Sequence, residues 1–262
     1  MRFDLVTVFP ELFAPFLTSG ITRRAFESGQ VDVRLNNPRD FSEGNYKRVD
    51  DRPYGGGPGM VMMAEPLARC MESIRLQRPE PVPVVLFSPL GRLLDQATVA
   101  SWASSEGAVL ICGRYEGIDQ RFVDKHVTHQ ISLGDFVMSG GEVAAMALLD
   151  AVARLQPGVL NTAASHQQDS FSPELDGLLD CPHYTRPQHW AGQAVPEVLM
   201  SGNHLDINQW RREQRLSITL RLRPDLIVRA RRGGRLSSED EAFLLASSTG
   251  NAAAATQCGC VP

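Results

Sequence analysis

Several features that would place the chain in a membrane, secreted or disulfide-stabilised class are missing from its sequence. No basic segment leads into an apolar run at the start, and no apolar run reaches the length that crosses a bilayer. The five cysteines are odd in number and scattered, which argues against a disulfide framework. The 262 residues, 43% hydrophobic and 21% charged, are typical of a soluble protein with one or two domains. We therefore predict a cytoplasmic protein.

Paired metal ligands are also scarce. Cys181 and His183 lie close together, but the sequence offers no second pair of ligands to go with them. A structural zinc site needs about four such ligands. Packing roles for both side chains are therefore favoured over a metal site.

Positive charge is not in excess over the whole chain, whose formal net charge is −4. It is concentrated between residues 211 and 235, where nine arginines and two acidic residues give a local charge of +7, against −11 for the remainder. A local positive potential attracts a polyanion whatever the total charge. The segment therefore predicts an anionic partner, with a solvated helix face as the alternative.

The glycine-rich loop at 49–60 lacks the Gly-Lys-Ser/Thr ending of a phosphate-binding P-loop, so ATP or GTP binding there is rejected. Its density of glycine and proline excludes regular structure. Long loops in compact domains tend to carry function, which favours a functional loop over a merely flexible one.

Three apolar stretches with strand character each end in glycines. The first, at 84–87, continues into Ser-Pro-Leu-Gly, and the second, at 108–112, continues into Gly-Arg-Tyr-Glu-Gly. The third reads ISLGDFVMSGG at 131–141 and opens an apolar helix. Glycine lets the backbone approach a ligand closely, and α/β sheets bind ligands beyond the carboxyl ends of their strands. The three ends together predict a small-molecule pocket.

Strand and helix patterns alternate along the first 157 residues, which predicts an α/β fold with a largely parallel sheet and helices on its faces. The helix at 142–155 is apolar nearly all round, so it should pack against the sheet or another subunit. Expected strands lie at 3–9, 31–35, 82–87, 108–112 and 127–133, and expected helices at 10–18, 22–28, 67–74, 95–104, 118–125 and 142–155.

The character of the sequence changes after Pro157. A polar stretch without periodicity follows, which is typical of a flexible interdomain linker. Further on, Asn203 is a candidate N-cap, and Ser237 with Asp240 resembles a capping box. Helices are expected at 203–220, 224–232 and 237–245, and the domains are predicted as 1–157 and 178–246, with a linker at 158–177 and a disordered tail at 247–262.

Four motifs are specific enough to carry a family resemblance. They are RPYGGGPGM at 52–60, CGRYEGIDQ at 112–120, GDFVMSGGE at 134–142 and LLDCPHYTRP at 178–187. In this order they resemble the bacterial tRNA (guanine-N1)-methyltransferases of the TrmD type, over about residues 1–235. The resemblance implies a SPOUT-type parallel sheet with a C-terminal trefoil knot, a small all-helical C-terminal domain that binds the tRNA anticodon stem-loop, and a homodimer. It also implies methyl transfer from S-adenosyl-L-methionine to N1 of the guanosine at tRNA position 37, next to the anticodon.

This chemistry needs a base for the N1 proton and a donor or cation beside O6, because neutral N1 is a poor nucleophile. A positioned base typically contributes about 10²–10⁴-fold. By resemblance, Asp169 is the general base and Arg154 the cation near O6, whereas the residues alone would suggest a solvated loop carboxylate and a helix-end arginine. The resemblance gives Glu116 two candidate roles, a contact to the methionine amine or a ligand of Mg²⁺.

The resemblance places the S-adenosyl-L-methionine pocket on the three glycine-bearing strand ends, where backbone groups would read the adenine. Family members often have Gln where Leu90 stands and Tyr where Phe136 stands, so one side-chain contact and one hydroxyl are absent. The expected cofactor-binding residues are Leu86, Phe87, Ser88, Pro89, Gly91, Gly113, Tyr115, Glu116, Ser132, Leu133, Gly134, Phe136, Met138, Gly140 and Gly141.

Two other functions stay open at this point. Another SPOUT-type RNA methyltransferase, acting on a different base or on a ribose 2′-OH, is the nearest alternative, and a 2′-O enzyme would not need Asp169 as a base. A catalytically silent RNA-binding module would use the arginines at 211–235 without needing three glycine-rich strand ends.

Overall fold

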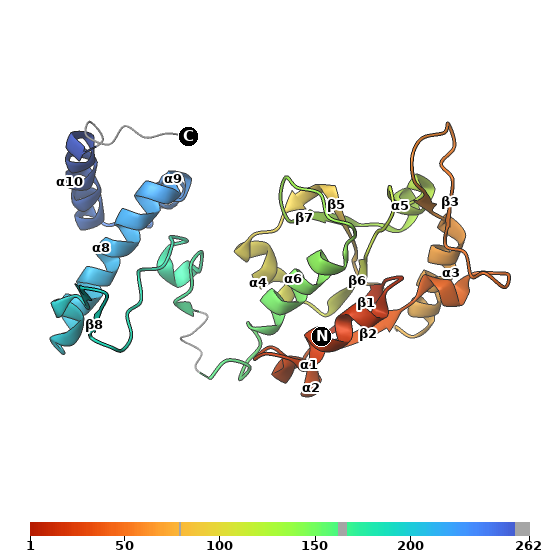
Figure 1. Ribbon diagram of the computed structural model, residues 1–262, viewed down its shortest axis with the longest axis horizontal. Helices are drawn as coiled ribbons and strands as arrows, with labels where there is room; N and C mark the ends of the chain where they lie inside the picture. The colour runs from red at the N-terminus through yellow and green to blue at the C-terminus, as the bar shows by residue number, and fades with distance from the viewer. Residues whose placement is uncertain (79, 162–166, 255–262) are drawn as a thin grey trace. The chain divides into compact units, whose positions relative to one another are not determined.

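The computed structural model describes residues 1–78, 80–161 and 167–254, with side chains described up to residue 247. The chain forms two compact units that divide between residues 162 and 163 (Figure 1). Among the described residues, no helix is long and apolar enough to span a bilayer.

A five-stranded sheet lies at the centre of the first unit (Figure 1). Every neighbouring pair of strands is parallel, which confirms the sheet expected from the alternating pattern. The strands, in spatial order, are β2 (Asp32–Asn36), β1 (Arg2–Val6), β6 (Gly107–Ile111), β5 (Val84–Leu93) and β7 (His129–Ser132).

Helices pack on both faces of this sheet, because successive residues of a strand point to opposite sides. Along β6, Ala108 and Leu110 belong to one buried cluster, and Val109 and Ile111 belong to another. The first cluster includes residues of α1 (Phe13–Thr18), α2 (Arg23–Glu27), α4 (Gln96–Ala103) and α6 (Glu142–Ala153), and the second includes residues of α3 (Ala64–Leu76) and α5 (Gln120–His126).

Strand β5 departs from the expectation that it ends at residue 87. It runs to Leu93, and both Phe87 and Arg92 lie opposite Ile131 of β7. Residues 88–91 between them therefore loop out of the ladder. The glycine-bearing segment expected after this strand is a bulge inside it.

The connecting segments contain shorter elements. The expected helix at 10–18 begins as the 3₁₀ turn η1 (Pro10–Leu12), because proline suits a first turn whose N–H would be unpaired. A second 3₁₀ turn is η2 (Pro38–Phe41). The glycine-rich loop is flanked by the antiparallel pair β3 (Asp50–Asp51) and β4 (Val61–Met62), which fixes its two ends.

The second unit is built on α8 (His204–Leu222), α9 (Pro224–Arg232) and α10 (Ser238–Ala254). Both predicted helix starts are confirmed. The Asn203 side chain accepts a hydrogen bond from the Leu205 N–H at 3.1 Å. The Ser237 N–H donates to the Asp240 carboxylate at 2.8 Å, and the Asp240 N–H donates to the Ser237 hydroxyl at 3.1 Å. The buried core of this unit consists of Leu178, Leu216, Ile227, Ala230 and Leu244.

The second unit is not all-helical, in contrast to the expectation. It contains the antiparallel pair β8 (His189–Trp190) and β9 (Gln193–Ala194), and the 3₁₀ turns η3 (Pro173–Leu175) and η4 (Glu197–Met200). Alternating apolar residues are too few there to mark strands of two residues each.

The segments expected to be a flexible linker and a disordered tail are partly ordered in the structure. In the linker, the Phe171 N–H donates to Leu178 O at 2.8 Å and the Ser172 hydroxyl donates to Gln167 O at 2.6 Å, so residues 167–177 form hydrogen-bonded turns of the second unit. Helix α10 continues to Ala254, beyond the expected start of the tail, since alanine is the strongest helix former. The linker residues 162–166 and the tail residues 255–262 lie outside the described residues.

Candidate functional site

The three glycine-bearing segments meet at one edge of the sheet. Because β6, β5 and β7 are parallel neighbours, their carboxyl ends lie side by side. The Gly141 N–H donates to Gly113 O at 3.0 Å, and an isolated bridge pairs Arg114 with Gly140. These contacts join segment 113–117 to segment 134–141.

Two of the glycines leave no room for any side chain. A Cβ on Gly91 would lie 2.4 Å from the backbone nitrogen of Ile131, and a Cβ on Gly140 would lie 2.2 Å from Arg114 Nε. Real Cβ atoms essentially never come closer than 3.0 Å to such neighbours. Glycine is therefore required for the close approach of the segments. The candidate ligand edge, formed by residues 88–91, 113–117 and 134–141, is walled largely by backbone.

Segment 134–141 presents backbone donors at this edge. Its start is held by Ser132, whose hydroxyl accepts from the Gly134 N–H at 3.2 Å. Within the described part of the chain, the N–H groups of residues 135–139 make no hydrogen bond. Such groups can bind the polar edge of a small ligand.

The predicted cofactor-binding residues fall into three groups by exposure. Leu86, Phe87, Ser132 and Gly141 are buried, and Pro89, Tyr115, Glu116 and Phe136 are exposed, while Ser88, Gly91, Gly113, Leu133, Gly134, Met138 and Gly140 are half-buried. The buried residues form the base of the edge and the exposed ones its rim.

Tyr115 adopts a left-handed backbone with φ of +60°. Its phenol oxygen accepts a hydrogen bond from Arg39 Nη2 at 3.3 Å. Partial burial and the nearby Asp50 carboxylate raise the pKa of Tyr115. The side chain is therefore a neutral phenol at physiological pH.

Glu116 packs against the glycine-rich loop. Its Oε1 would lie 2.4 Å from a Cβ on Gly59, and its N–H donates to Met60 O at 2.9 Å. No group of three His, Cys, Asp or Glu side chains in the described ranges is placed to hold a metal ion. The Mg²⁺ role of Glu116 therefore stays a prediction.

The two predicted catalytic residues belong to different units. Arg154 is the half-buried C-cap of α6, and its N–H donates to Asp150 O at 3.0 Å. Asp169 is half-buried in the segment before η3, where its carbonyl oxygen accepts from the Ser172 N–H at 3.1 Å. Each lies on a segment held by hydrogen bonds within its own unit, and the catalytic roles stay predictions.

The arginine-rich segment of the second unit divides into paired and unpaired residues. Ion pairs join Arg212 to Asp240 and Asp176, Arg215 to Asp180, Arg223 to Asp225, and Arg231 to Glu241. Arg211, Arg221, Arg229 and Arg232 are exposed and make no ion pair within the described residues. These four arginines offer more of their charge to an anionic partner than the ion-paired ones do.

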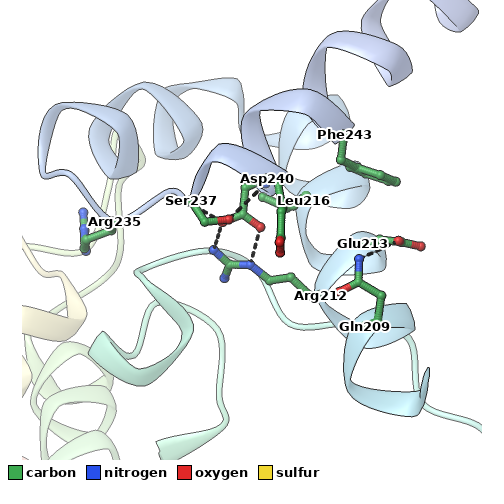
Figure 2. A pocket seen from close by; sticks show the side chains of 9 residues that line it. Gln209, Arg212, Glu213, Leu216, Arg235, Ser237, Asp240 and Phe243 are labelled. Carbon is green, nitrogen blue, oxygen red and sulfur yellow. Dashed lines mark hydrogen bonds and ion pairs between the residues drawn. The ribbon is translucent and has the colours of Figure 1, made fainter. Parts of the chain in front are cut away.

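A cavity of about 300 Å³ lies between α8 and the start of α10 in the same unit (Figure 2). Arg212 lines it, but the guanidinium is bound by both oxygens of Asp240, at 2.9 and 2.7 Å. Figure 2 shows this pair beside Ser237, whose backbone N–H also binds Asp240. The ion pair between Arg212 and Asp240 therefore forms part of the cavity wall.

Two buried residues beside the ligand edge, Thr7 and Glu142, were not predicted as site residues from the sequence. Glu142, the first residue of α6, is 1% exposed, and its carboxylate accepts a hydrogen bond from the Thr7 hydroxyl at 2.9 Å. An acidic residue at a helix start is common because of the helix dipole, so Glu142 carried no distinct signal. Its burial depends on β1, which is distant in sequence.

The structure combines a parallel α/β unit, whose glycine-bearing segments lie together, with a second unit that carries exposed arginines. This is the arrangement predicted for a protein with a small-molecule site and an anionic partner. Comparison with known proteins identifies the family. Residues 1–229 match the family described as tRNA (Guanine-1)-methyltransferase TrmD. The chain belongs to this family.

Curated relatives agree with this match. The chain is 75% identical, over 244 residues, to a tRNA (guanine-N(1)-)-methyltransferase of Albidiferax ferrireducens, with 93% of this chain and 98% of the relative covered. It is 66% identical, over 248 residues, to the protein of the same name from a Polaromonas species, with coverage of 93% and 96%. The corresponding Bordetella pertussis protein is 54% identical over 248 residues, with the same coverage.

Proposed function

We propose that this chain transfers a methyl group from S-adenosyl-L-methionine to N1 of guanosine 37 in tRNA, next to the anticodon. Membership of the family makes the chain a tRNA (guanine-N1)-methyltransferase. The observation that carries the proposal is that, in a member of this family, three glycine-bearing segments lie on neighbouring strands: the bulge of β5 and the segments that follow β6 and β7.

The ligand edge fits S-adenosyl-L-methionine because its walls are backbone. The N–H groups of residues 135–139 would bind the polar atoms of the adenosine. Leu86 and Phe87 are buried on opposite faces of the sheet, and β5 would bring their backbone to the cofactor. When bound, the cofactor supplies a methyl group on positively charged sulfur, which N1 of guanine accepts. The remaining cofactor-binding residues are those predicted from the sequence.

Asp169 takes the N1 proton of guanine, and Arg154 stabilises the negative charge that develops on O6. A carboxylate suits this role because guanine N1 becomes nucleophilic only as its proton leaves. Removal of such a base typically costs about 10²–10⁴-fold in rate. The assignment rests on the match of each residue to the family's motifs, and each is half-buried on a hydrogen-bonded segment of its own unit.

The second unit binds the anticodon stem-loop through its unpaired arginines. Arg211, Arg221, Arg229 and Arg232 supply exposed positive charge and form no ion pair in the described ranges, with the Asp225 carboxylate near Arg229. Contacts of this kind between arginines and phosphates dominate the affinity for nucleic acids.

A homodimer is part of the proposal. Val137 is 92% exposed and Val143 is 61% exposed, both next to the ligand edge. In the proposed homodimer, a second copy of the chain would cover these exposed apolar side chains. The trefoil knot of the SPOUT fold and a Mg²⁺ ion at Glu116 complete the proposal.

The test is methyl transfer from labelled S-adenosyl-L-methionine to unmodified tRNA that carries guanosine at position 37. The wild type is compared with Asp169→Ala, and Glu174→Ala serves as control because Glu174 is an exposed carboxylate on the neighbouring turn η3. We expect transfer to N1 in the wild type and the control, and a loss of about 10²–10⁴-fold in Asp169→Ala.

Three results would revise the proposal in different ways. Transfer that persists in Asp169→Ala would move the base to another residue. Cofactor binding without transfer to this guanosine would indicate a different target nucleotide, as in another SPOUT-type RNA methyltransferase. A wild type that binds no cofactor would overturn the proposal.

A further inference from the structure

One acidic side chain at the ligand edge is buried, and the proposed chemistry does not use it. The side chain of Glu142 is 1% exposed, and both of its oxygens are bound within the first unit. Oε1 accepts a hydrogen bond from the Thr7 hydroxyl at 2.9 Å, and Oε2 accepts from Arg114 Nε at 2.8 Å. A buried charge is costly unless it is paired and hydrogen-bonded, so such a group needs a reason to be there.

The Thr7 hydroxyl has a second partner, since it accepts a hydrogen bond from the Phe9 N–H at 3.0 Å. The Phe9 ring in turn lies under the guanidinium of Arg114, with the guanidinium carbon 4.6 Å from the ring centroid. Thr7 and Phe9, which follow β1, therefore contact Glu142 and Arg114 respectively. The carboxylate is therefore held between a helix start and the residue that follows a β-strand.

Arg114 extends from this anchor across the two cofactor segments. It belongs to segment 113–117, and its Nη1 donates to the Ser139 carbonyl oxygen at 3.2 Å, in segment 134–141. The pair passes so close to Gly140 that a Cβ there would lie 2.2 Å from Arg114 Nε and 2.6 Å from the Glu142 carboxylate. The backbone of the second segment is thus seated directly on the ion pair.

We propose that Glu142 is a positioning residue for the cofactor site. Held by Thr7, it fixes Arg114, and Arg114 fixes segment 134–141 against segment 113–117 at the separation that the cofactor requires. Glu142 itself touches neither cofactor nor guanine. This inference rests on the proposed function, because it concerns the affinity of the same site for S-adenosyl-L-methionine.

The cofactor-free protein offers a direct readout of the segment positions. The Gly141 N–H donates to Gly113 O across the two segments, whereas the Cys112 N–H donates to Val6 O inside the sheet. In Glu142→Gln, the neutral amide weakens the hold on Arg114, so we expect amide hydrogen exchange at Gly141 to become about tenfold faster or more. Exchange at Cys112 should stay unchanged, which separates a local effect from general loss of stability.

The second readout is cofactor affinity, measured by calorimetry with S-adenosyl-L-methionine and no tRNA. We expect Glu142→Gln to raise Kd about tenfold to a hundredfold, the usual size for a hydrogen bond between charged groups. In steady-state assays the KM for the cofactor should rise by a similar factor, and kcat should change much less. Thr7→Val should produce a smaller rise in Kd, and Thr7→Ser, which keeps the hydroxyl, should restore the wild-type value.

A double-mutant cycle tests whether Glu142 acts through Arg114. If it does, Glu142→Gln combined with Arg114→Met should bind the cofactor no more weakly than Arg114→Met alone. Additive losses in Kd would overturn the proposal, as would unchanged exchange at Gly141. A wild type that binds and transfers methyl normally, with Glu142→Gln equal to it in Kd, would refute this inference and leave the proposed function standing. A wild type that binds no cofactor would refute the proposed function, while hydrogen exchange would still decide the role of Glu142 in positioning the segments.

Discussion

Replacing Arg212 with methionine should destabilise the second unit strongly, because this arginine joins three separate segments. Its Nε and Nη2 donate to the two oxygens of Asp240 at 2.9 and 2.7 Å, and its Nη1 donates to Asp176 at 2.8 Å (Figure 2 shows the Asp240 pair). The bonds link α8 to the start of α10 and to the end of η3. Methionine keeps the apolar stem and removes only the charged, hydrogen-bonding head.

The size of the loss follows from burial. The Asp240 side chain is 8% exposed and that of Arg212 is 22% exposed. Removing one partner of a buried pair typically costs about 3–5 kcal/mol, since the other charge stays buried without compensation. Asp240 keeps its bond from the Ser237 N–H, so we expect the lower end, about 3 kcal/mol, or roughly a hundredfold in the opening equilibrium.

Arg231 provides a matched control. It also forms a bidentate pair with a carboxylate of α10, at 2.7 Å to each oxygen of Glu241, but the side chains are 51% and 34% exposed. An exposed pair contributes little because water and salt screen it. Native-state hydrogen exchange of the α8 and α10 amides would measure both variants in the intact chain. Equal losses of protection in Arg212→Met and Arg231→Met would refute the argument from burial.

The same pair makes the second unit sensitive to acid. The hydrogen bonds from Arg212 hold the pKa of Asp240 below its usual range. A carboxylate whose pKa is lowered by folding stabilises the folded state above its unfolded pKa, about 3.9, and loses this contribution as the pH falls further. The difference in stability between wild type and Arg212→Met should therefore be full at neutral pH and narrow below about pH 4. A difference that widens in acid would contradict the assignment.

Two further predictions concern the sheet and the arginines. Gly91→Ala should destabilise the first unit by about 1–3 kcal/mol or more, as overpacking does, because its Cβ would lie 2.4 Å from the backbone of Ile131. Urea unfolding of the first unit would measure this loss of stability. An unchanged unfolding midpoint would contradict the close approach. Arg211→Ala should weaken tRNA binding and lower the slope of log affinity against log salt concentration by about one unit per lost phosphate contact. Arg215→Ala should lower this slope less, because Arg215 forms an ion pair with Asp180 at 3.4 Å. Equal slopes for the two variants would argue against a distinction between paired and unpaired arginines.

Local signals in the sequence predicted the parts of the structure that depend on local interactions. Asn203 caps α8 through a bond to a residue two positions away, and the capping box of Ser237 and Asp240 spans three positions. The strand and helix periods predicted the parallel sheet, since each period reflects which side of an element is buried. The glycine-bearing segments were predicted to lie together, and they do, because parallel neighbours place their carboxyl ends side by side.

Features that depend on distant partners escaped prediction. The bulge at residues 88–91 exists because β5 pairs with β7 on both sides of it, and nothing within the segment indicates this. The hairpin of β8 and β9 has two residues in each strand, too few for an alternating pattern. The turns at 167–177 were expected to be flexible because their composition is polar, yet they bond to Leu178 and to one another.

The sequence by itself determined the order of strands and helices, the helix caps, the positions of the glycines and, through four motifs, the family. Only the tertiary structure decided which charges are buried and which are available. Glu142 is bound by Thr7, 135 positions away, and Arg212 by Asp176, 36 positions away. Burial of an ionic group depends on partners that the folded chain brings together, and the residues next to it in sequence do not indicate which partners these are.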